Sequence, residues 1–465
     1  DAFVRLATLL LADQQVAEDA VIAAFATSYL RDPKLHSYEH AVSYVRTAVV
    51  NKARSCQPAE RDATPPETPE DLAYWCLRGL LARQREVLVL KLATPDLSDD
   101  DIREMREAGF EATTDPARLD EVKTIVICVP TPLSEDGGPD LGPINSAVGT
   151  IAEHLQPGQT IILESTTYPG TTDEVVRPAL EAGGLEAGKD FFLAFSPERI
   201  DPGNEQFGAK NTPKVVGGHT PACGDAAAAF YGQFVDTVVR AKGTREAETA
   251  KLLENTYRHI NIALVNEMAR FCHDLDIDLW DVIAAAKTKP FGFQAFYPGP
   301  GVGGHCIPID PNYLSYNVRA KLGYPFRFVE LAQEINATMP AYVVQRAQNI
   351  LNEDSKSLRG STVLLLGVTY KPDIADQRES PAVPLAQQLI AKGASVQYFD
   401  AKVADWKAVP EAERVDDLDA AVAAADLTIL VQNHKSYDVD ALAAASKRFF
   451  DTRGVADDGE KVERL

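Results

Sequence analysis

The stretch VKTIVICVPTPLSEDGGPDLGPINSAVGTIAEHLQPGQTIILEST, residues 122–166, decides the fold. Its two ends, VKTIVICV and QTIILEST, are unbroken runs of apolar and mostly β-branched residues, which is typical of strands buried on both faces of a parallel sheet. Between them, INSAVGTIAEHL carries apolar residues at helical spacing. A strand, a helix and a strand in this order predict a doubly wound α/β sheet.

The same alternation returns further along the chain. DFFLAFSPE (190–198) continues the first unit, residues 244–287 are strongly helical, and STVLLLGV, ASVQYFD and DLTILV are strands of a second unit. We therefore expect an α/β protein with two Rossmann-like parallel-sheet domains joined by a long helical connector. The expected division is an all-α segment over 1–102, an α/β domain over 103–243, a central helical domain over 244–355 and a second α/β domain over 356–465.

Composition excludes several classes of partner. The formal net charge of −22 argues against nucleic acid and anionic membrane surfaces, because both require a positive face. The six cysteines are scattered without C-x-x-C spacing, so we expect reduced thiols and no metal site. No signal peptide and no apolar run of about 18 residues is seen, which predicts a soluble cytoplasmic protein without membrane contact.

One loop carries the sharpest chemical signal. GPGVGGHCIPIDP places Cys306 directly after Gly303 and Gly304, where glycine lets the backbone approach a ligand closely. Main-chain N–H groups in such a turn lower the pKa of a thiol and make it a nucleophile. A buried structural cysteine is the alternative. Asp310, four residues later, can orient a water or a lysine, or can simply cap the loop.

A second candidate lies on the long connector. Lys251 and Asn255 are four residues apart and therefore share a helical face. Lysine can stabilise an alkoxide or oxyanion, and asparagine can donate a hydrogen bond to it. Taken alone, Lys251 is more simply a solvated surface residue, but its combination with the cysteine loop favours catalysis.

The ends of the predicted strands supply further candidates, because ligands bind at the carboxyl edge of open α/β sheets. Thr166 ends one strand, and Glu198, after the next, is a candidate general base whose alternative is an ion pair with Arg199. Cys128 is more simply a packing residue. Basic or polar residues that follow strands of the second unit would suit a pyrophosphate, and they are Tyr370, Lys371, Arg378 and Arg453.

Residues from about 103 to 465 resemble the UDP-glucose/UDP-N-acetylhexosamine 6-dehydrogenase family. The motifs that carry this resemblance are ATTDPARL, CVPTPLSEDGGPDL, LESTTYPGTT, FSPERIDPG, AKLLENTY, FYPGPGVGGHCIPIDP, TYKPDIADQRESP and DTRGV. The resemblance implies that an NDP-sugar is oxidised at its C6 hydroxymethyl group to the uronic acid, with two NAD consumed per sugar. UDP-glucose and UDP-N-acetylglucosamine are the expected substrate types, and thymidine-diphospho sugars remain open.

The resemblance also implies residue roles. Cys306 would form a thiohemiacetal and then a thioester, and Lys251 and Asn255 would stabilise the oxygen that gains charge. Asp310 and Thr166 would position water, with Glu198 assisting proton transfer. The implied NAD contacts are Val129, Pro130, Thr131, Thr166 and Arg378. The implied substrate contacts are Gly303, Gly304, Tyr297, Tyr370, Lys371 and Arg453. Family members are typically dimeric or larger, so we expect at least a dimer.

The N-terminal part departs from this pattern. The family begins with a G-x-G-x-x-G turn for the NAD pyrophosphate, yet Gly79 and Gly109 are the only glycines before Val122. We therefore expect the first half of the NAD-binding domain to be replaced. Residues 1–100 resemble a fragment of an extracytoplasmic-function sigma factor, through AEDAVIAAFATSYLR, SYVRTAVVNKARS and RQREVLVLKL. They hold 11 Lys and Arg against 15 Asp and Glu, which argues against DNA as a partner.

Three functions stay open at this point. The first is a working NAD-dependent sugar dehydrogenase with an N-terminal appendage. The second is a nucleotide-sugar-binding protein whose catalysis is impaired by the lack of the glycine-rich turn. The third is a sigma-fragment fusion that senses a sugar nucleotide, which the shortage of basic residues disfavours.

Overall fold

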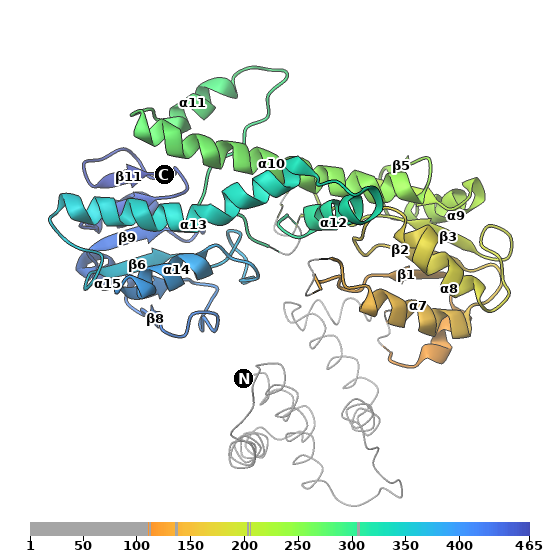
Figure 1. Ribbon diagram of the computed structural model, residues 1–465. Coiled ribbons are helices and arrows are strands. Elements are labelled where there is room, and N and C mark those ends of the chain that lie inside the picture. The colour runs from red at the N-terminus through yellow and green to blue at the C-terminus, as the bar shows by residue number, and fades with distance from the viewer. Residues whose placement is uncertain (1–109, 111–112, 135–137, 202–203, 205, 305–306) are drawn as a thin grey trace, which may run out of the picture. The chain divides into compact units, whose positions relative to one another are not determined.

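The computed structural model describes residues 110, 113–134, 138–201, 204, 206–304 and 307–465 (Figure 1). Residues 119–465 form one compact unit. The all-α segment expected over 1–102 and its likeness to a sigma factor lie outside the described residues. Among the described helices, none is long and apolar enough to cross a membrane.

The first sheet has the strand order β1-β2-β3-β4-β5. Its strands are β1 (Thr124–Ile127), β2 (Thr160–Leu163), β3 (Phe192–Phe195), β4 (Lys214–Gly218) and β5 (Val238–Arg240). All neighbours are parallel except β3 and β4, which pair antiparallel. The predicted Rossmann-like parallel arrangement is therefore confirmed, with one reversed strand that the sequence analysis did not anticipate.

Both faces of this sheet are covered, as the apolar strands predict. The helices are α7 (Gly142–His154), α8 (Arg177–Glu181), which follows the π-helical turn Thr172–Val176, and α9 (Pro221–Tyr231). In β2, Ile161 and Leu163 join the core beneath α7 and α8, whereas Ile162 packs on the opposite side with Tyr231 of α9. Successive strand residues face opposite sides of a sheet, so a strand covered on both faces must be apolar throughout.

Two glycines at the end of β4 allow a close approach of the main chain. A Cβ on Gly217 would overlap the main chain at Gly243, and a Cβ on Gly218 would overlap the main chain of Gly224 in α9. The end of β4 thus lies in backbone contact with the segments that begin α9 and α10. Only glycine permits this close approach.

The central part is built on two long helices, α10 (Thr244–Asp274) and α13 (Arg327–Glu353), which pack along one another (Figure 1). The helical stretch expected over 244–287 is divided into two helices, of which α10 is the first. It stops where Asp276 adopts a left-handed conformation with φ 58°. Asp278 then caps α11 (Leu279–Ala286) by accepting from the Trp280 N–H. The remaining helix of this part is α12 (Asp310–Leu322).

The second sheet has the order β11-β10-β9-β6-β7-β8, and every pair in it is parallel. Its strands are β6 (Thr362–Leu366), β7 (Ser395–Phe399), β8 (Glu413–Arg414), β9 (Leu427–Leu430), β10 (Phe449–Asp451) and β11 (Val462–Arg464). Helix α14 (Ala382–Ala391) and α13 cover one face, and α15 (Leu418–Ala424) and α16 (Val439–Ala445) cover the other. The second predicted Rossmann-like unit is confirmed.

Candidate active site

The connector helix brings three predicted catalytic residues together. The side-chain amide of Asn255 donates a hydrogen bond of 2.6 Å to the carboxylate of Asp310, the first residue of α12. Asp310 is only 3% exposed. Burial raises the pKa of Asp310 to about 7, although the positive charge of Lys251 and the bond from Asn255 oppose the shift. Lys251 and Asn255 are themselves half-buried on the same helical face.

The glycine-rich loop precedes Asp310 in the chain. Cys306 and His305 lie outside the described residues, but the loop before them is held closely. Gly304 donates its N–H to the Arg378 carbonyl at 3.1 Å. A Cβ on Gly303 would stand 2.7 Å from the Tyr370 Cβ, and a Cβ on Gly304 would stand 2.8 Å from the Tyr370 ring. The predicted substrate-binding residues of the loop and of the second α/β unit therefore meet.

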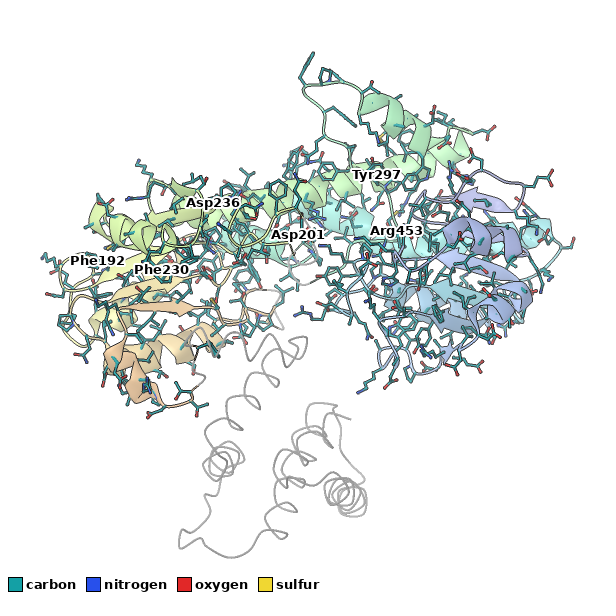
Figure 2. All side chains as sticks on the ribbon, turned by 180° about the vertical axis from the view of Figure 1, so that it is seen from behind. Phe192, Asp201, Phe230, Asp236, Tyr297 and Arg453 are labelled. Atoms are coloured by element: carbon teal, nitrogen blue, oxygen red, sulfur yellow. The ribbon has the colours of Figure 1, made fainter. Side chains whose placement is uncertain are left out.

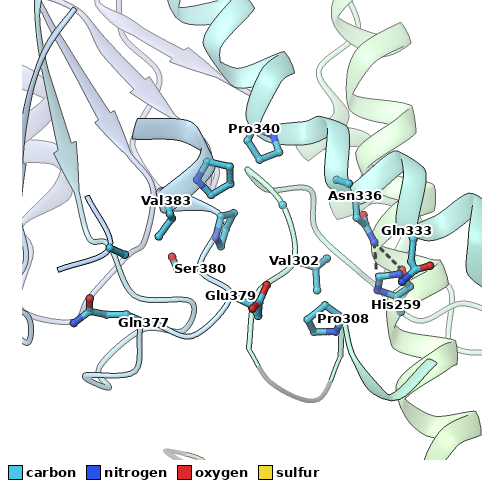
Figure 3. Close-up of a pocket in the computed structure, with 15 residues that line it drawn as sticks. His259, Val302, Pro308, Gln333, Asn336, Pro340, Gln377, Glu379, Ser380 and Val383 are labelled. Atoms are coloured by element: carbon cyan, nitrogen blue, oxygen red, sulfur yellow. Dashed lines mark hydrogen bonds between the residues drawn. The ribbon is translucent and has the colours of Figure 1, made fainter. Parts of the chain in front are cut away.

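Behind the loop lies a cavity of about 530 Å³ (Figure 3). The central helices contribute His259, Gln333 and Asn336 to its lining, and the segment after Arg378 contributes Glu379 and Ser380. The loop residue Val302 closes it on a third side. The loop therefore has this cavity on one side and the Tyr370 ring on the other.

Arg453 and Tyr297 belong to one cluster at the start of the loop (Figure 2). The Arg453 guanidinium lies 3.1 Å from where a Cβ on Gly299 would stand, and its Nε donates to the Val431 carbonyl at 2.7 Å. Tyr297 stacks on Trp280 with ring centroids 6.0 Å apart. Exposed rings beside an arginine suit a nucleobase and its phosphates.

Lys371 and Arg378 are both engaged by carboxylates. Lys371 contacts Asp201 at 2.6 Å, an ion pair between the two α/β units of the chain. Arg378 contacts Asp376 at 2.5 Å, and its side chain is largely exposed. A diphosphate that binds here would have to compete with these carboxylates.

The predicted cofactor contacts gather at the carboxyl ends of β1 and β2. The Thr131 hydroxyl donates to the Thr166 carbonyl at 2.8 Å, and the Ser165 hydroxyl donates to the Val129 carbonyl at 2.7 Å. Tyr313 of α12 donates to the Thr131 carbonyl, which ties this edge to the central helices. Pro130 is exposed between them.

Glu198 lies in a different group, with Lys214 at its centre. Lys214 contacts Glu164 at 2.7 Å and Glu198 at 3.4 Å. Glu198 also accepts from the Ile200 N–H at 2.5 Å. The alternative ion pair of Glu198 with Arg199 is wrong, because Arg199 pairs with Glu254 at 2.8 Å.

Cys128 lies on the edge of the same group. Its thiol donates to Glu164 at 3.2 Å, and burial together with that carboxylate raises its pKa to about 12. A thiol held in the protonated form is a poor nucleophile. The Cys128 residue is exposed, so the packing role predicted for it is not supported.

Sequence reasoning missed Glu248, which connects α10 to the loop after Thr166. Its buried carboxylate accepts from the Gly170 N–H at 2.5 Å, the Thr172 N–H at 2.9 Å and the Thr172 hydroxyl at 2.7 Å. Burial raises the pKa of Glu248. A glutamate inside a helix ordinarily faces water, so the only available signal was its position one turn before Lys251.

Comparisons with known proteins identify the family of the chain. Three family models match in order along the chain: the NAD binding domain of the UDP-glucose/GDP-mannose dehydrogenase family over residues 88–235, its central domain over 245–338, and its UDP binding domain over 364–458. The chain therefore belongs to the UDP-glucose/GDP-mannose dehydrogenase family. It is similar to NAD-dependent nucleotide-sugar dehydrogenases over most of its length.

Two curated relatives illustrate the range. A UDP-N-acetyl-D-mannosamine dehydrogenase from Methanocaldococcus jannaschii is 33% identical over 366 residues, covering 74% of this chain and 80% of the relative. A UDP-N-acetyl-D-glucosamine 6-dehydrogenase from Pseudomonas aeruginosa is 34% identical over 336 residues, covering 72% and 79%.

Solved structures show the same fold. A UDP-D-ManNAc dehydrogenase from Pyrococcus horikoshii superposes with a TM-score of 0.71 at 28% identity, covering 82% of this chain and 91% of that one. A UDP-glucose dehydrogenase from Pyrobaculum islandicum gives a TM-score of 0.68 at 25% identity, covering 78% and 85%.

NAD is the cofactor of this family. The described residues at the carboxyl ends of β1 and β2 could form part of its binding site. The edge formed by Val129, Thr131 and Thr166 presents main-chain and hydroxyl groups at the carboxyl ends of adjacent parallel strands. The buried hydroxyl of Thr167 beside it has no hydrogen-bond partner among the described residues. An unsatisfied polar group at this edge is consistent with a site completed by a ligand.

Proposed function

We propose that the chain oxidises the C6 hydroxymethyl group of a nucleotide-diphosphate sugar to the carboxylate, with two NAD reduced per sugar. The observation that carries this proposal is the contact of Asn255 with the buried Asp310 beside Lys251. A lysine, an amide and a carboxyl of raised pKa can together hold an oxyanion and a water. Cys306 of the glycine-rich loop precedes Asp310 by four residues in the sequence.

In this proposal NAD, when bound, accepts the hydride of each oxidation. The Cys306 thiolate adds to the C6 aldehyde carbon to give a thiohemiacetal, and after the second oxidation the sugar is held as a thioester. Lys251 and Asn255 stabilise the negative charge on the C6 oxygen. Asp310 and Thr166 position the hydrolytic water, Glu198 assists its deprotonation, and the Cys306 thiol leaves with the acid product.

The substrate is proposed from three sets of residues. Tyr297, Gly303 and Gly304 would line the nucleotide and sugar, Tyr370 with Lys371 and Arg453 would hold the diphosphate, and Val129, Pro130, Thr131 and Arg378 would serve the cofactor. The named relatives act on UDP-N-acetylglucosamine and UDP-N-acetylmannosamine. Because the FYPGPG form of the loop favours glucose- and N-acetylglucosamine-type substrates, we place UDP-glucose and UDP-N-acetylglucosamine first.

The domain division at 102, 243 and 355, the sigma-factor likeness of residues 1–100 and at least a dimeric state remain part of the proposal. Apolar side chains on α10 support self-association, since Leu253 is 65% exposed and Leu264 is 53% exposed. Light scattering tests it, and a monomer would exclude the dimer.

A second candidate is a nucleotide-sugar-binding protein without dehydrogenase activity. It rests on one feature of the sequence, because no G-x-G-x-x-G turn precedes Val122. Without the turn, the pyrophosphate of NAD would lose its ordinary main-chain donors.

One assay separates the two candidates. Purified protein is mixed with NAD and a panel of UDP-glucose, UDP-N-acetylglucosamine, UDP-N-acetylmannosamine and thymidine-diphosphoglucose, and NADH is followed by absorbance. Two NADH per sugar, lost in Cys306→Ser, support the dehydrogenase. Binding of a nucleotide sugar without NADH supports the second candidate.

A further inference from the structure

Two buried asparagines join the central helices to the start of the glycine-rich loop. Asn266 of α10 is fully buried, and Asn336 of α13 is 5% exposed. The Asn266 amide donates to the Asn336 side-chain oxygen at 2.9 Å, and its own oxygen accepts from the Gly299 N–H at 2.9 Å. A buried amide that uses both ends in this way fixes the distance between the helix and the loop.

His259 sets the orientation of Asn336. The Asn336 amide donates to the His259 carbonyl at 3.3 Å and faces the ring Nδ1 at 3.5 Å (Figure 3). Burial lowers the pKa of His259 to about 4, so its ring is neutral at ordinary pH and its Nδ1 can accept. Donors and acceptors thus alternate from Gly299 through both asparagines to His259. A flip of either side-chain amide would leave two donors or two acceptors in contact.

The loop is held at several points. Residues 297–303 form no helix or strand. Just before them, the Phe296 ring packs edge-on against Tyr257 of α10, with centroids 5.7 Å apart. Gly304 is held by the Arg378 carbonyl. The bond from Gly299 to Asn266 adds a directional hydrogen bond between the loop and the helix that also carries Lys251 and Asn255.

The spacing on that helix is regular. Asn266 is eleven residues after Asn255, which is close to three turns, so the two side chains project from nearly the same face about 16 Å apart. A helix with this spacing holds the oxyanion-stabilising amide and the loop anchor at a constant separation. The loop reaches Cys306 seven residues after Gly299.

We propose that Asn266 and Asn336 are positioning residues, which set the place of the glycine-rich loop and so of Cys306 relative to Lys251 and Asn255. This inference rests on the proposed function, because it assigns a purpose to the position of that thiol. Neither asparagine touches the reacting atoms. Their effect is transmitted through the Gly299 amide.

The test replaces Asn266 by aspartate, which has almost the same shape. Aspartate still accepts from Gly299, but it sets a carboxylate oxygen against the Asn336 oxygen in place of a donor. Asn261→Asp is the matched control, since Asn261 lies on the same helix and donates only to the Tyr257 carbonyl one turn earlier, at 2.7 Å. Both variants introduce one negative charge into α10.

Two quantities are measured in the folded fraction of each protein. The first is the kcat for NADH formation with a nucleotide sugar. The second is the alkylation rate of Cys306 by iodoacetamide, read by mass spectrometry of its peptide. We expect Asn266→Asp to lower kcat by about 10- to 100-fold and to change the alkylation rate several-fold, because small displacements of a nucleophile cost large factors in rate. Asn261→Asp should change both by less than about twofold.

If both variants give equal values, the positioning role is wrong. If Asn266→Asp does not fold, Asn336→Ala is measured instead. This variant keeps both groups of the Gly299–Asn266 hydrogen bond, but it removes the acceptor that holds the Asn266 amide in its orientation. Asn336→Ala should then shift the alkylation rate in the same direction, and an unchanged rate overturns the proposal. Alkylation of Cys306 does not require catalytic turnover. If the wild-type protein forms no NADH, the proposed function is refuted, but the effect of each variant on the loop can still be measured by alkylation.

Discussion

The Asn255 side chain donates to Asp310 across 55 positions of sequence, and the acceptor is a carboxyl group that burial keeps partly protonated at neutral pH. Lys251 on the same helix supplies a positive charge that opposes this effect. Burial therefore favours the protonated form of Asp310, whereas Lys251 and Asn255 favour the ionised form.

We expect kcat to rise with pH around a midpoint of about 7, because Asp310 must be ionised to position and activate water. Asp310→Asn should remove this rise and lower kcat by about 100-fold or more. The measurement is kcat against pH from about 5.5 to 9 at saturating substrate. An unchanged pH midpoint in the variant would assign the titration to another group.

The same proton affects stability. The pKa of Asp310 is raised from 3.8 to about 7 on folding, so its contribution to the free energy of unfolding is full below about pH 4 and is lost as pH rises to about 7. The difference in unfolding free energy between wild type and Asp310→Asn should decline across this window by up to about 1.4 kcal/mol per pH unit and stay constant above about pH 8. Urea denaturation at several pH values tests this, and a difference that does not vary with pH contradicts it.

Glu248→Ala should destabilise the protein by about 3 kcal/mol or more, because it leaves two buried N–H groups and one hydroxyl without an acceptor. Glu254→Ala is the control on the same helix, since that side chain is 41% exposed and pairs only with Arg199 in an ion pair. It should change stability by less than about 1 kcal/mol. The free energy of unfolding of both variants is measured by chemical denaturation. If both lose the same amount, Glu248 does not hold the loop after Thr166.

The ion pair of Lys371 with Asp201 should compete with the substrate diphosphate. Asp201→Asn is expected to lower KM for the nucleotide sugar by about two- to fivefold, whereas Lys371→Ala raises it by about tenfold or more. Lys356 forms a similar pair with Asp426 at 2.6 Å, and Lys356→Ala should leave KM unchanged. A KM that rises in Asp201→Asn would mean that Asp201 supports substrate binding instead.

Gly454→Ala should weaken both stability and substrate binding. Gly454 has φ +64°, and a Cβ there would overlap the Trp280 indole, which stacks on Tyr297 next to Arg453. Gly360→Ala is the control for backbone strain alone, because Gly360 has φ +84° with nothing within 4 Å of its Cβ. We expect about 1 kcal/mol of destabilisation for Gly360→Ala and at least twice that, with a raised KM, for Gly454→Ala. If the two variants lower the melting temperature equally, the Trp280 indole moves aside without destabilising the protein.

The strands and the connector helix were predictable because each has a strong local pattern. TIIL in β2 is buried at all four positions, and α10 and α11 together fill most of the stretch 244–287 that was expected to be helical. The reversal of β4 was not predictable, because an apolar run reads the same for a parallel and an antiparallel strand. The need for Gly217 and Gly218 was not predictable either, since it arises from main-chain contacts with Gly243 and Gly224. Local patterns report local structure, and strand direction is settled by packing.

In the site, sequence reasoning found residues whose type suits the chemistry and missed those that hold them. Lys251, Asn255 and Asp310 share a face or a loop that spacing reveals. Asn266 and Asn336 are 70 positions apart, and neither type signals burial, because asparagine is mostly exposed. The partner that stabilises a buried amide is visible only in three dimensions.

Helix α10 contacts one loop through Glu248 and another through Asn266, with Lys251 and Asn255 between them. The helix therefore fixes both the distance and the angle between these two contacts. The 18 residues from Glu248 to Asn266 span about 27 Å and about five turns, at about 100° per residue. One alanine inserted between Ala263 and Leu264 would turn Asn266 by about 100° away from its loop while Glu248 kept its own. Single substitutions can be tolerated at positions of this helix that make no such contact, but its length between Glu248 and Asn266 cannot change.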